Sequence, residues 1–159
     1  MAERKPTAAQ ARRMRSAARF YAVQALFQME AADVGAEAVT EEFETHRLGA
    51  EIDGVTFADA DLEHFRWLVS SAVTDQGRID QLTQKALAVR WPIDRIDPTL
   101  RALFRAAGAE LVATDTPPKV TINEYVDIAK AFYPDGKESK FVNAVLDHMA
   151  RAARPEAFD

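Results

Sequence analysis

Apolar residues recur every three or four positions along most of the chain, which is the spacing of an amphipathic helix with one buried face. Phe20, Val23 and Phe27 follow this spacing near the start and are expected to point inward, and Val126 and Ala129 follow it near the end. The chain holds no convincing strand. The pattern therefore predicts an all-α fold, a bundle of about seven helices.

Glycine, proline and turn residues predict where these helices begin and end. Gly77 and Trp91-Pro92 interrupt the pattern and could divide the bundle into two small subdomains. Asp97-Pro98 opens a helix with proline in its first turn, and Asp135-Gly136 supplies a turn. The first two expected helices cover about residues 11–32 and 37–47. The third starts near Asp59, and Gly77 separates it from the fourth. The fifth runs from Asp97-Pro98 to Thr116-Pro117-Pro118, and the last two lie within about residues 121–149.

Two helix starts are predicted from capping residues. Thr121 and Glu124 have the spacing of a capping box, in which the Thr side chain accepts from the amide three residues on and the Glu reaches back. Thr56 is a candidate cap for the helix that starts near Asp59. Trp67 lies in an apolar stripe, so we expect it in the core, as we do Trp91.

Length and composition indicate one cytoplasmic domain. The chain has 159 residues, 48% of them apolar, which is enough to bury a core. It has no cysteine, which excludes a disulfide framework and a thiol nucleophile and fits a reducing cytoplasm. No apolar run approaches the ~20 residues of a membrane span, and the basic N-terminus lacks the apolar segment of a secretory signal. We expect a disordered basic leader over residues 1–10 and a single domain over residues 11–155.

Charge is unevenly distributed along the chain. Its net charge is −5, yet residues 1–19 carry +5 and the remaining residues carry −10. The acidic part would repel nucleic acid in general. A basic end can still bind it locally, because the Debye length is only ~8 Å at physiological salt.

The arginines of this basic end have a helical spacing. If the first helix begins near Ala11, then Arg12, Arg15 and Arg19 lie at i, i+3 and i+7 on one face, with Arg13 beside them. Guanidinium groups bind phosphates through paired hydrogen bonds and can stack on bases. The spacing suggests RNA or DNA binding, while a solvated leader that keeps the protein soluble remains the alternative.

Lys140 and Phe141 stand where the last helix is expected to begin. A lysine there is unfavourable for the helix dipole, and a bound phosphate would relieve this and use the free amides. Phe141 could stack on a base, which contributes ~1–3 kcal/mol in single-strand binders. Spacing alone favours the other interpretation, in which Phe141 is a core residue and Lys140 is solvated.

Patterns for catalysis or metal binding are weak. His46, His64 and His148 are scattered, and Asp61 shares a helix face with His64 but has no second such pair nearby. A salt bridge explains that pair better than a metal. The chain has no P-loop, no GxGxxG and no nucleophile elbow. We therefore expect no enzyme activity, no cofactor and no metal site.

Three segments, in this order, resemble the NusB family of transcription antitermination proteins. They are Ala22-Val-Gln-Ala-Leu-Phe27, Leu100-Arg-Ala-Leu-Phe-Arg-Ala-Ala-Gly-Ala-Glu-Leu111, and a C-terminal signature of Ile122-Asn-Glu followed by Lys140-Phe-Val-Asn-Ala-Val-Leu-Asp147. The resemblance covers the chain from about Arg12 to Met149. It departs from the family at Ala144, where many relatives have Gly, at Ala109, which replaces a frequent Tyr, and in a longer loop over residues 133–139.

The resemblance implies a fold and a set of RNA-binding residues. The family fold has a three-helix half, here about 11–76, and a four-helix half, about 78–153. Its basic segment helps to bind a single-stranded RNA element called boxA, and its matching Lys-Phe pair lies at the RNA surface, which favours that role for Lys140 and Phe141. Arg78 stands where relatives often have an aromatic residue near RNA. The candidates are Arg12, Arg13, Arg15, Arg19, Arg78, Lys137, Lys140 and Phe141, of which Arg15 and Arg19 align with family arginines.

The resemblance also implies a function without catalysis. Family members bind boxA in nascent ribosomal RNA jointly with NusE, a small-subunit ribosomal protein, and help RNA polymerase and other Nus factors pass terminators. Two alternatives remain. The chain is a helical protein-interaction module or homodimer that does not bind RNA, or it is part of an RNA-modifying enzyme, for which it has no catalytic domain or cofactor motif.

Overall fold

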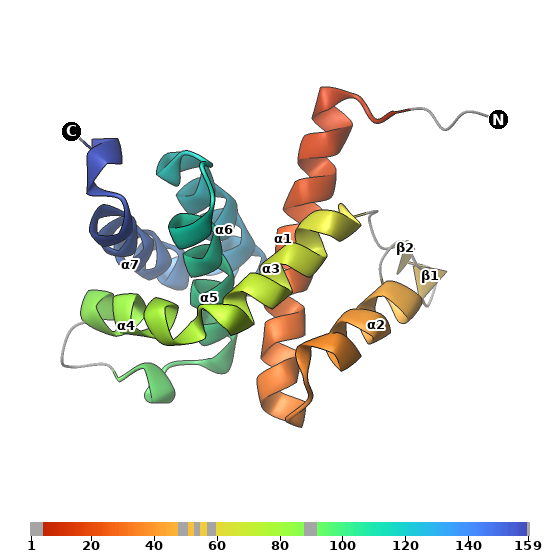
Figure 1. The fold of residues 1–159 in the computed structure, drawn as a ribbon, viewed down its shortest axis with the longest axis horizontal. Helices are drawn as coiled ribbons and strands as arrows, with labels where there is room; N and C mark the ends of the chain where they lie inside the picture. The colour runs from red at the N-terminus through yellow and green to blue at the C-terminus, as the bar shows by residue number, and fades with distance from the viewer. Residues whose placement is uncertain (1–4, 48–50, 53–54, 57–59, 88–91, 159) are drawn as a thin grey trace.

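A long N-terminal helix, α1 (Ala8–Ala32), runs through the molecule, and several of the other helices pack along it (Figure 1). The computed structural model describes residues 5–47, 51–52, 55–56, 60–87 and 92–158. Within that part of the chain the further helices are α2 (Ala36–His46), α3 (Leu62–Thr74), α4 (Gln76–Leu87), α5 (Pro98–Ala113), α6 (Pro118–Phe132) and α7 (Lys137–Ala153), with short 3-10 turns η1 (Ile93–Arg95) and η2 (Pro155–Phe158). The predicted all-α bundle is confirmed.

One small element was not expected. The strands β1 (Glu51–Ile52) and β2 (Val55–Thr56) form an antiparallel pair in which Glu51 faces Thr56 and Ile52 faces Val55. Strands of two residues carry too little alternating pattern to be recognised in a sequence. They lie beside the end of α2, away from the four later helices (Figure 1).

The helix α5 forms the centre of the core. Every residue from Leu100 to Leu111 except Arg105 is buried, because α1, α3, α4, α6 and α7 all pack around this helix. A helix that is buried on all sides needs apolar or small residues throughout, and the alanines of α5 let its neighbours approach closely. Buried apolar residues from all seven α-helices form one cluster around it. The division of the chain into a three-helix and a four-helix half stays a prediction.

Several helix boundaries differ from the prediction. The prediction that Thr121 and Glu124 form a capping box is wrong, because α6 begins at Pro118 and Thr121 is buried inside the helix. Asp61, not Thr56, caps α3, and its side chain accepts a hydrogen bond from the His64 amide at 3.0 Å. Proline in the first turn and an Asx cap set these starts more directly than a Thr-x-x-Glu spacing does.

Three further predictions concern the start of α5, the break at Gly77 and the turn before α7. The start of α5 at Asp97-Pro98 is confirmed, with the Asp97 side chain accepting from the Thr99 amide. Gly77 is not the residue that ends the third helix, since α3 ends at Thr74 with Asp75 as its C-cap and Gly77 lies within α4. Gly136 has a left-handed φ of 84° and precedes the first residue of α7, Lys137, so the predicted turn is present.

The N-terminal helix also begins earlier than predicted. Thr7 and Gln10 form a reciprocal capping box, so residues 8–10 of the predicted leader are helical. Phe27 was expected to point inward, but it is 38% exposed. Trp67 packs partly buried against the core as expected, whereas Trp91 lies outside the described residues.

Candidate nucleic-acid interface

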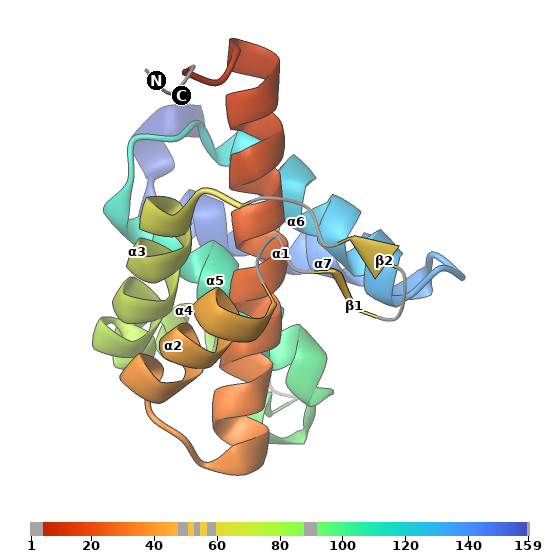
Figure 2. The same cartoon turned by 90° about the vertical axis from the view of Figure 1, so that its right-hand side faces the viewer.

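The first turns of α1 extend beyond the rest of the bundle and carry the basic residues (Figures 1 and 2). Arg12 and Arg13 are exposed there, and Arg15 is partly buried. The Thr7 capping box makes this end helical, so the arginine side chains project from a rigid element instead of a flexible leader. Cations on a projecting helix end are accessible to a phosphate backbone from several directions.

The predicted arginine face is exposed at the start of α1 and becomes buried further along the helix. Arg12, Arg15 and Arg19 do share one face, but this face descends into the bundle, and Arg19 is only 4% exposed. Its neighbours Ala18 and Ala22 are fully buried. The spacing of Arg19 therefore has a structural explanation, and its side chain is not part of the exposed arginine surface.

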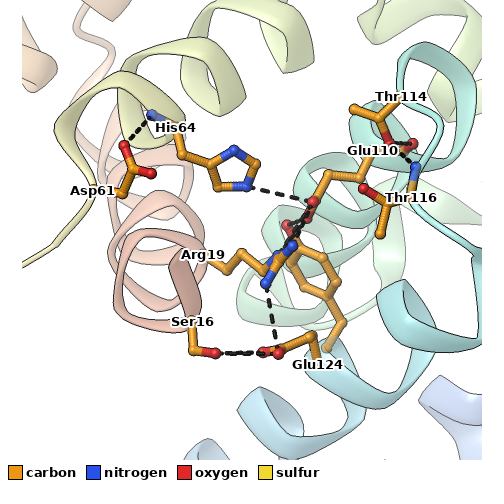
Figure 3. Close-up of polar contacts among 9 residues, drawn as sticks. Ser16, Arg19, Asp61, His64, Glu110, Thr114, Thr116 and Glu124 are labelled. Atoms are coloured by element: carbon orange, nitrogen blue, oxygen red, sulfur yellow. Dashed lines mark hydrogen bonds and ion pairs between the residues drawn. The ribbon is translucent and has the colours of Figure 1, made fainter. Parts of the chain in front are cut away.

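Arg19 forms an ion pair with Glu110 of α5 in the core (Figure 3). Arg19 Nε lies 2.9 Å from Glu110 Oε2, and Arg19 Nη2 lies 3.0 Å from Oε1, so the two planar groups face each other. The buried Tyr125 hydroxyl donates to Glu110 Oε2 at 2.6 Å. His64 Nε2 approaches Glu110 Oε1 to 3.4 Å, and Arg19 Nη1 lies 3.6 Å from Glu124 Oε1.

These contacts determine the ionisation of the cluster. Burial by itself would raise the pKa of Glu110, but the contacts from His64 and Arg19 outweigh it and lower that pKa to about 2. Burial would lower the pKa of Arg19, and the adjacent Glu110 carboxylate raises it instead. Burial and the same carboxylate raise the pKa of Tyr125 well above its usual value. The pair is therefore charged, and Tyr125 stays a hydrogen-bond donor to it.

The cluster links the basic helix to the C-terminal signature. Ser16 Oγ lies 2.9 Å from Glu124 Oε2 and 3.1 Å from Oε1, so this hydroxyl bonds the carboxylate that also contacts Arg19 (Figure 3). Glu124 belongs to the Ile-Asn-Glu motif of α6. The motif residue that was expected to cap a helix thus holds α6 against α1 just below the exposed arginines.

A second group of candidates lies on the first two turns of α7. Lys137 is its first residue rather than a loop residue, and Lys137 and Lys140 are both exposed. Phe141 is partly buried and packs edge-on against the core residue Phe104, with ring centroids 6.2 Å apart. Both interpretations of Phe141 therefore apply in part, since one portion of the ring joins the core and another reaches the surface.

The predicted residues do not form one continuous patch. The first turns of α1 lie at the top of Figure 2 and the α6–α7 connection lies at its right edge, so these two groups are well separated. Arg78 is exposed on α4. The structure gathers Lys137, Lys140 and Phe141 in one place and Arg12, Arg13 and Arg15 in another.

Polar residues that sequence reasoning missed fasten α1, α4 and η1 to α5. Arg101 is buried, donates to the carbonyl of Ile93 at 2.8 Å, and pairs with Glu30. Arg105 binds Asp80 through two hydrogen bonds of 3.0 and 3.1 Å. The hydrogen bond from Arg101 holds the pKa of Glu30 below its usual range. The signal was present as arginines within an otherwise apolar helix, where each needs a carboxylate partner.

The structure offers no metal centre among its described residues. No group of three or more potential ligands comes together there, and Asp61 serves as a helix cap while the His64 ring stacks on Trp67. No helix in the same part of the chain is both long and apolar enough to cross a membrane.

The fold defines a small protein built mainly of α-helices, with exposed cations near the start of α1 and of α7. Residues 16–151 match the model of the NusB family, and the chain belongs to that family. Transcription antitermination protein NusB of Brucella abortus (strain S19) is 49% identical over 144 residues, covering 90% of this chain and 84% of that protein. NusB of Mesorhizobium japonicum is 48% identical and covers 89% of this chain and 92% of its own. The resemblance drawn from three segments is confirmed, and the chain is not an enzyme.

Solved structures agree with this membership. A NusB structure from T. maritima superposes with a TM-score of 0.71 at 28% identity and covers 98% of this chain and 99% of its own. The crystal structure of antitermination factors NusB and NusE in complex with double-stranded RNA contains a chain with a TM-score of 0.70 at 27% identity, covering 88% of this chain and 98% of that one.

Proposed function

We propose that this protein is an RNA-binding transcription antitermination factor that acts in the cytoplasm. It binds boxA-type single-stranded RNA in nascent ribosomal RNA together with a NusE-type ribosomal protein. The bound complex, with other Nus factors, helps RNA polymerase read through terminators. The membership in the NusB family, whose solved relatives include a complex with NusE and RNA, supports RNA and NusE as partners.

One observation carries the RNA-binding role for this chain. Arg12 and Arg13 are exposed on a helix end that extends beyond the acidic body of the protein, and Lys140 and Phe141 add a cation and an aromatic ring on α7. The arginines and lysines set affinity through phosphates, while Phe141 supplies a surface for a base. Arg15 stands between exposed and buried positions and contributes from the edge of this surface. Arg78 and Lys137 stay candidates for further phosphate contacts.

The first test is binding of a short boxA-like RNA, with and without the NusE-type protein, at two salt concentrations. Each phosphate contact on a single strand contributes about −0.7 to the slope of log K against log salt. We expect salt-sensitive binding that tightens when the partner is present. An absence of RNA binding in both conditions contradicts the proposal.

A second candidate function is a protein-interaction module or homodimer without RNA binding. Phe27 and Val34 near the end of α1, and Val73 at the end of α3, are exposed apolar residues, and a pocket of about 560 Å³ opens between Val34, Val73 and α4. An interface through these exposed apolar residues would give binding that depends little on salt. Four of the charged residues that also line the pocket, Glu30, Asp80, Arg101 and Arg105, are already paired with one another. Sedimentation of the protein alone, at rising concentration and two salt concentrations, distinguishes this function from the first.

A further inference from the structure

A pocket of about 380 Å³ opens beside the first turn of α7, next to the proposed RNA surface. Phe141 and Tyr133 contribute aromatic rings to it, and Leu100 and Ile96 contribute aliphatic surface. Phe141 belongs to both this pocket and the proposed RNA surface, so the two are continuous. The pocket is large enough for a planar ring system in addition to water.

The two carboxylates that line this pocket, those of Asp97 and Glu138, differ in how many hydrogen bonds they accept. Asp97 is fully engaged, since its Oδ1 accepts from the Thr99 amide and its Oδ2 accepts from the Tyr133 hydroxyl, both at 2.8 Å. Glu138 also lines the pocket, yet its Oε2 atom is buried and has no hydrogen-bond partner in the described part of the chain. A buried acceptor without a donor is unfavourable. A ligand that offers N–H groups to this carboxylate, after rotation about its side-chain bonds, would remove that cost.

The charges around the pocket indicate the kind of ligand. Arg95 and Lys137 line it and are exposed, Lys140 follows Lys137 by one helical turn, and no ion pair engages any of the three among the described residues. The lining also holds the carboxylates of Asp97 and Glu138. Asp97 already accepts hydrogen bonds from Thr99 and Tyr133, so the exposed cations at the edge of the pocket remain available to attract a phosphate. A pocket that holds a carboxylate and two aromatic rings, with cations at its edge, matches a nucleotide whose phosphates stay outside and whose base enters.

We propose that this pocket receives one unstacked guanine base of the RNA and that Glu138 is the residue that selects it. The Watson–Crick edge of guanine presents two adjacent donors, N1–H and the N2 amino group, which match the two oxygens of a carboxylate. The same edge of uracil presents one N–H between two carbonyl oxygens, which the carboxylate repels. Tyr133 and Phe141 supply the stacking surfaces. This inference rests on the proposed RNA-binding function and adds a base preference to it.

The test measures binding of a labelled single-stranded oligouridylate of about nine nucleotides, a length within the range of single-strand sites. Two further probes carry a central guanosine or a central inosine, which lacks the N2 amino group. We expect the native protein to prefer the guanosine probe over oligouridylate by about tenfold, in the range of a well-made carboxylate–base contact. Inosine should fall between the two.

Glu138→Gln should abolish the preference for guanosine, while its affinity for oligouridylate stays the same or increases because a negative charge is removed. Glu41→Gln is the matched control, since Glu41 is an exposed glutamate on α2 and its substitution removes the same charge. Melting temperatures equal to that of the native protein in both variants would show that neither change affects the fold.

The outcomes separate this inference from the function on which it rests. Salt-sensitive binding of all three probes without a guanosine preference, or a preference that persists in Glu138→Gln, overturns the base assignment and leaves the RNA-binding role intact. No binding of any probe overturns both. A variant that discriminates bases normally but binds the NusE-type protein more weakly would assign the pocket to a protein side chain and also overturns the inference.

Discussion

Glu110 and Arg19 form an ion pair in which both side chains are almost entirely removed from water. Taking two charges out of water is costly, and their attraction offsets this cost only when hydrogen bonds occupy the remaining acceptor sites. Tyr125 and His64 surround the Glu110 carboxylate, and Glu124 faces the far side of Arg19. The pair therefore adds little stability over an apolar substitute, but removing one partner leaves the other charged and buried.

Glu110→Gln should lower the free energy of unfolding by about 3–5 kcal/mol, the usual cost of breaking a buried pair from one side. Urea unfolding followed by circular dichroism measures this change. Tyr125→Phe keeps both charges and removes one hydrogen bond, so it should cost only about 1–3 kcal/mol. If the free energy of unfolding decreased equally in the two variants, the lost charge of Glu110 would not be the main cause of the destabilisation.

The Glu110 carboxylate also makes the stability of the folded protein depend on pH at acidic pH. The pKa of Glu110 is about 2 in the folded protein and near its ordinary value of 4.5 when unfolded. Its contribution to stability is therefore complete above about pH 4.5 and is lost as the pH falls toward 2. Between pH 5.5 and 3, Tyr125→Phe should lose stability much as the native protein does. Glu110→Gln should lose less, and an identical loss in that variant would refute the assignment.

At the scale of elements, the contact between α4 and α5 depends on the absence of a side chain. A Cβ atom added at Gly108 would overlap the Cγ2 methyl group of Ile79, and Ile79 is fully buried. The glycine thus serves close packing between two helices, although it lowers the intrinsic helix preference of α5.

Gly108→Ala should destabilise the protein by about 1–3 kcal/mol, because the overlap outweighs the gain in helix preference. Thermal unfolding measures the change. Gly77→Ala is the matched control, since Gly77 lies within α4 and a Cβ there meets nothing within 4 Å. That control should be neutral or stabilising, and an equal destabilisation in both variants would contradict the packing explanation.

At the scale of the whole molecule, charge is separated along the fold. Exposed arginines lie on the projecting end of α1, while residues beyond position 19 carry a net charge of −10. In the proposed function, such a distribution would direct an RNA strand to the ends of two helices and keep it away from the acidic surface. Solubility and local nucleic-acid binding are therefore compatible in one small acidic protein.

Replacing both Arg12 and Arg13 with Ala should weaken boxA-type RNA binding and reduce the salt slope by about 1.4, or 0.7 for each phosphate that is no longer neutralised. The melting temperature should not change, since both side chains are exposed. The matched control replaces Lys85 and Lys119, two exposed lysines on α4 and α6, and removes the same charge. If both double variants lower the slope equally, net charge and not the α1 site governs binding.

The sequence by itself determined the helical class, the start of α5 at Asp97-Pro98 and the turn at Gly136. These features depend on residues a few positions apart, which periodicity and capping describe well. It also carried the family signature in three ordered segments.

Only the tertiary structure decided which face of each helix meets a neighbour. Arg19 shares a helix face with Arg12, but Glu110, which lies 91 positions away in the chain, makes it a core residue. Phe27 continues an apolar stripe yet stays exposed, and Glu124 bonds Ser16 where a helix cap was expected. The pocket at Glu138 likewise exists only where η1, α5, α6 and α7 meet. Burial and pairing depend on contacts between distant segments, and no local spacing contains that information.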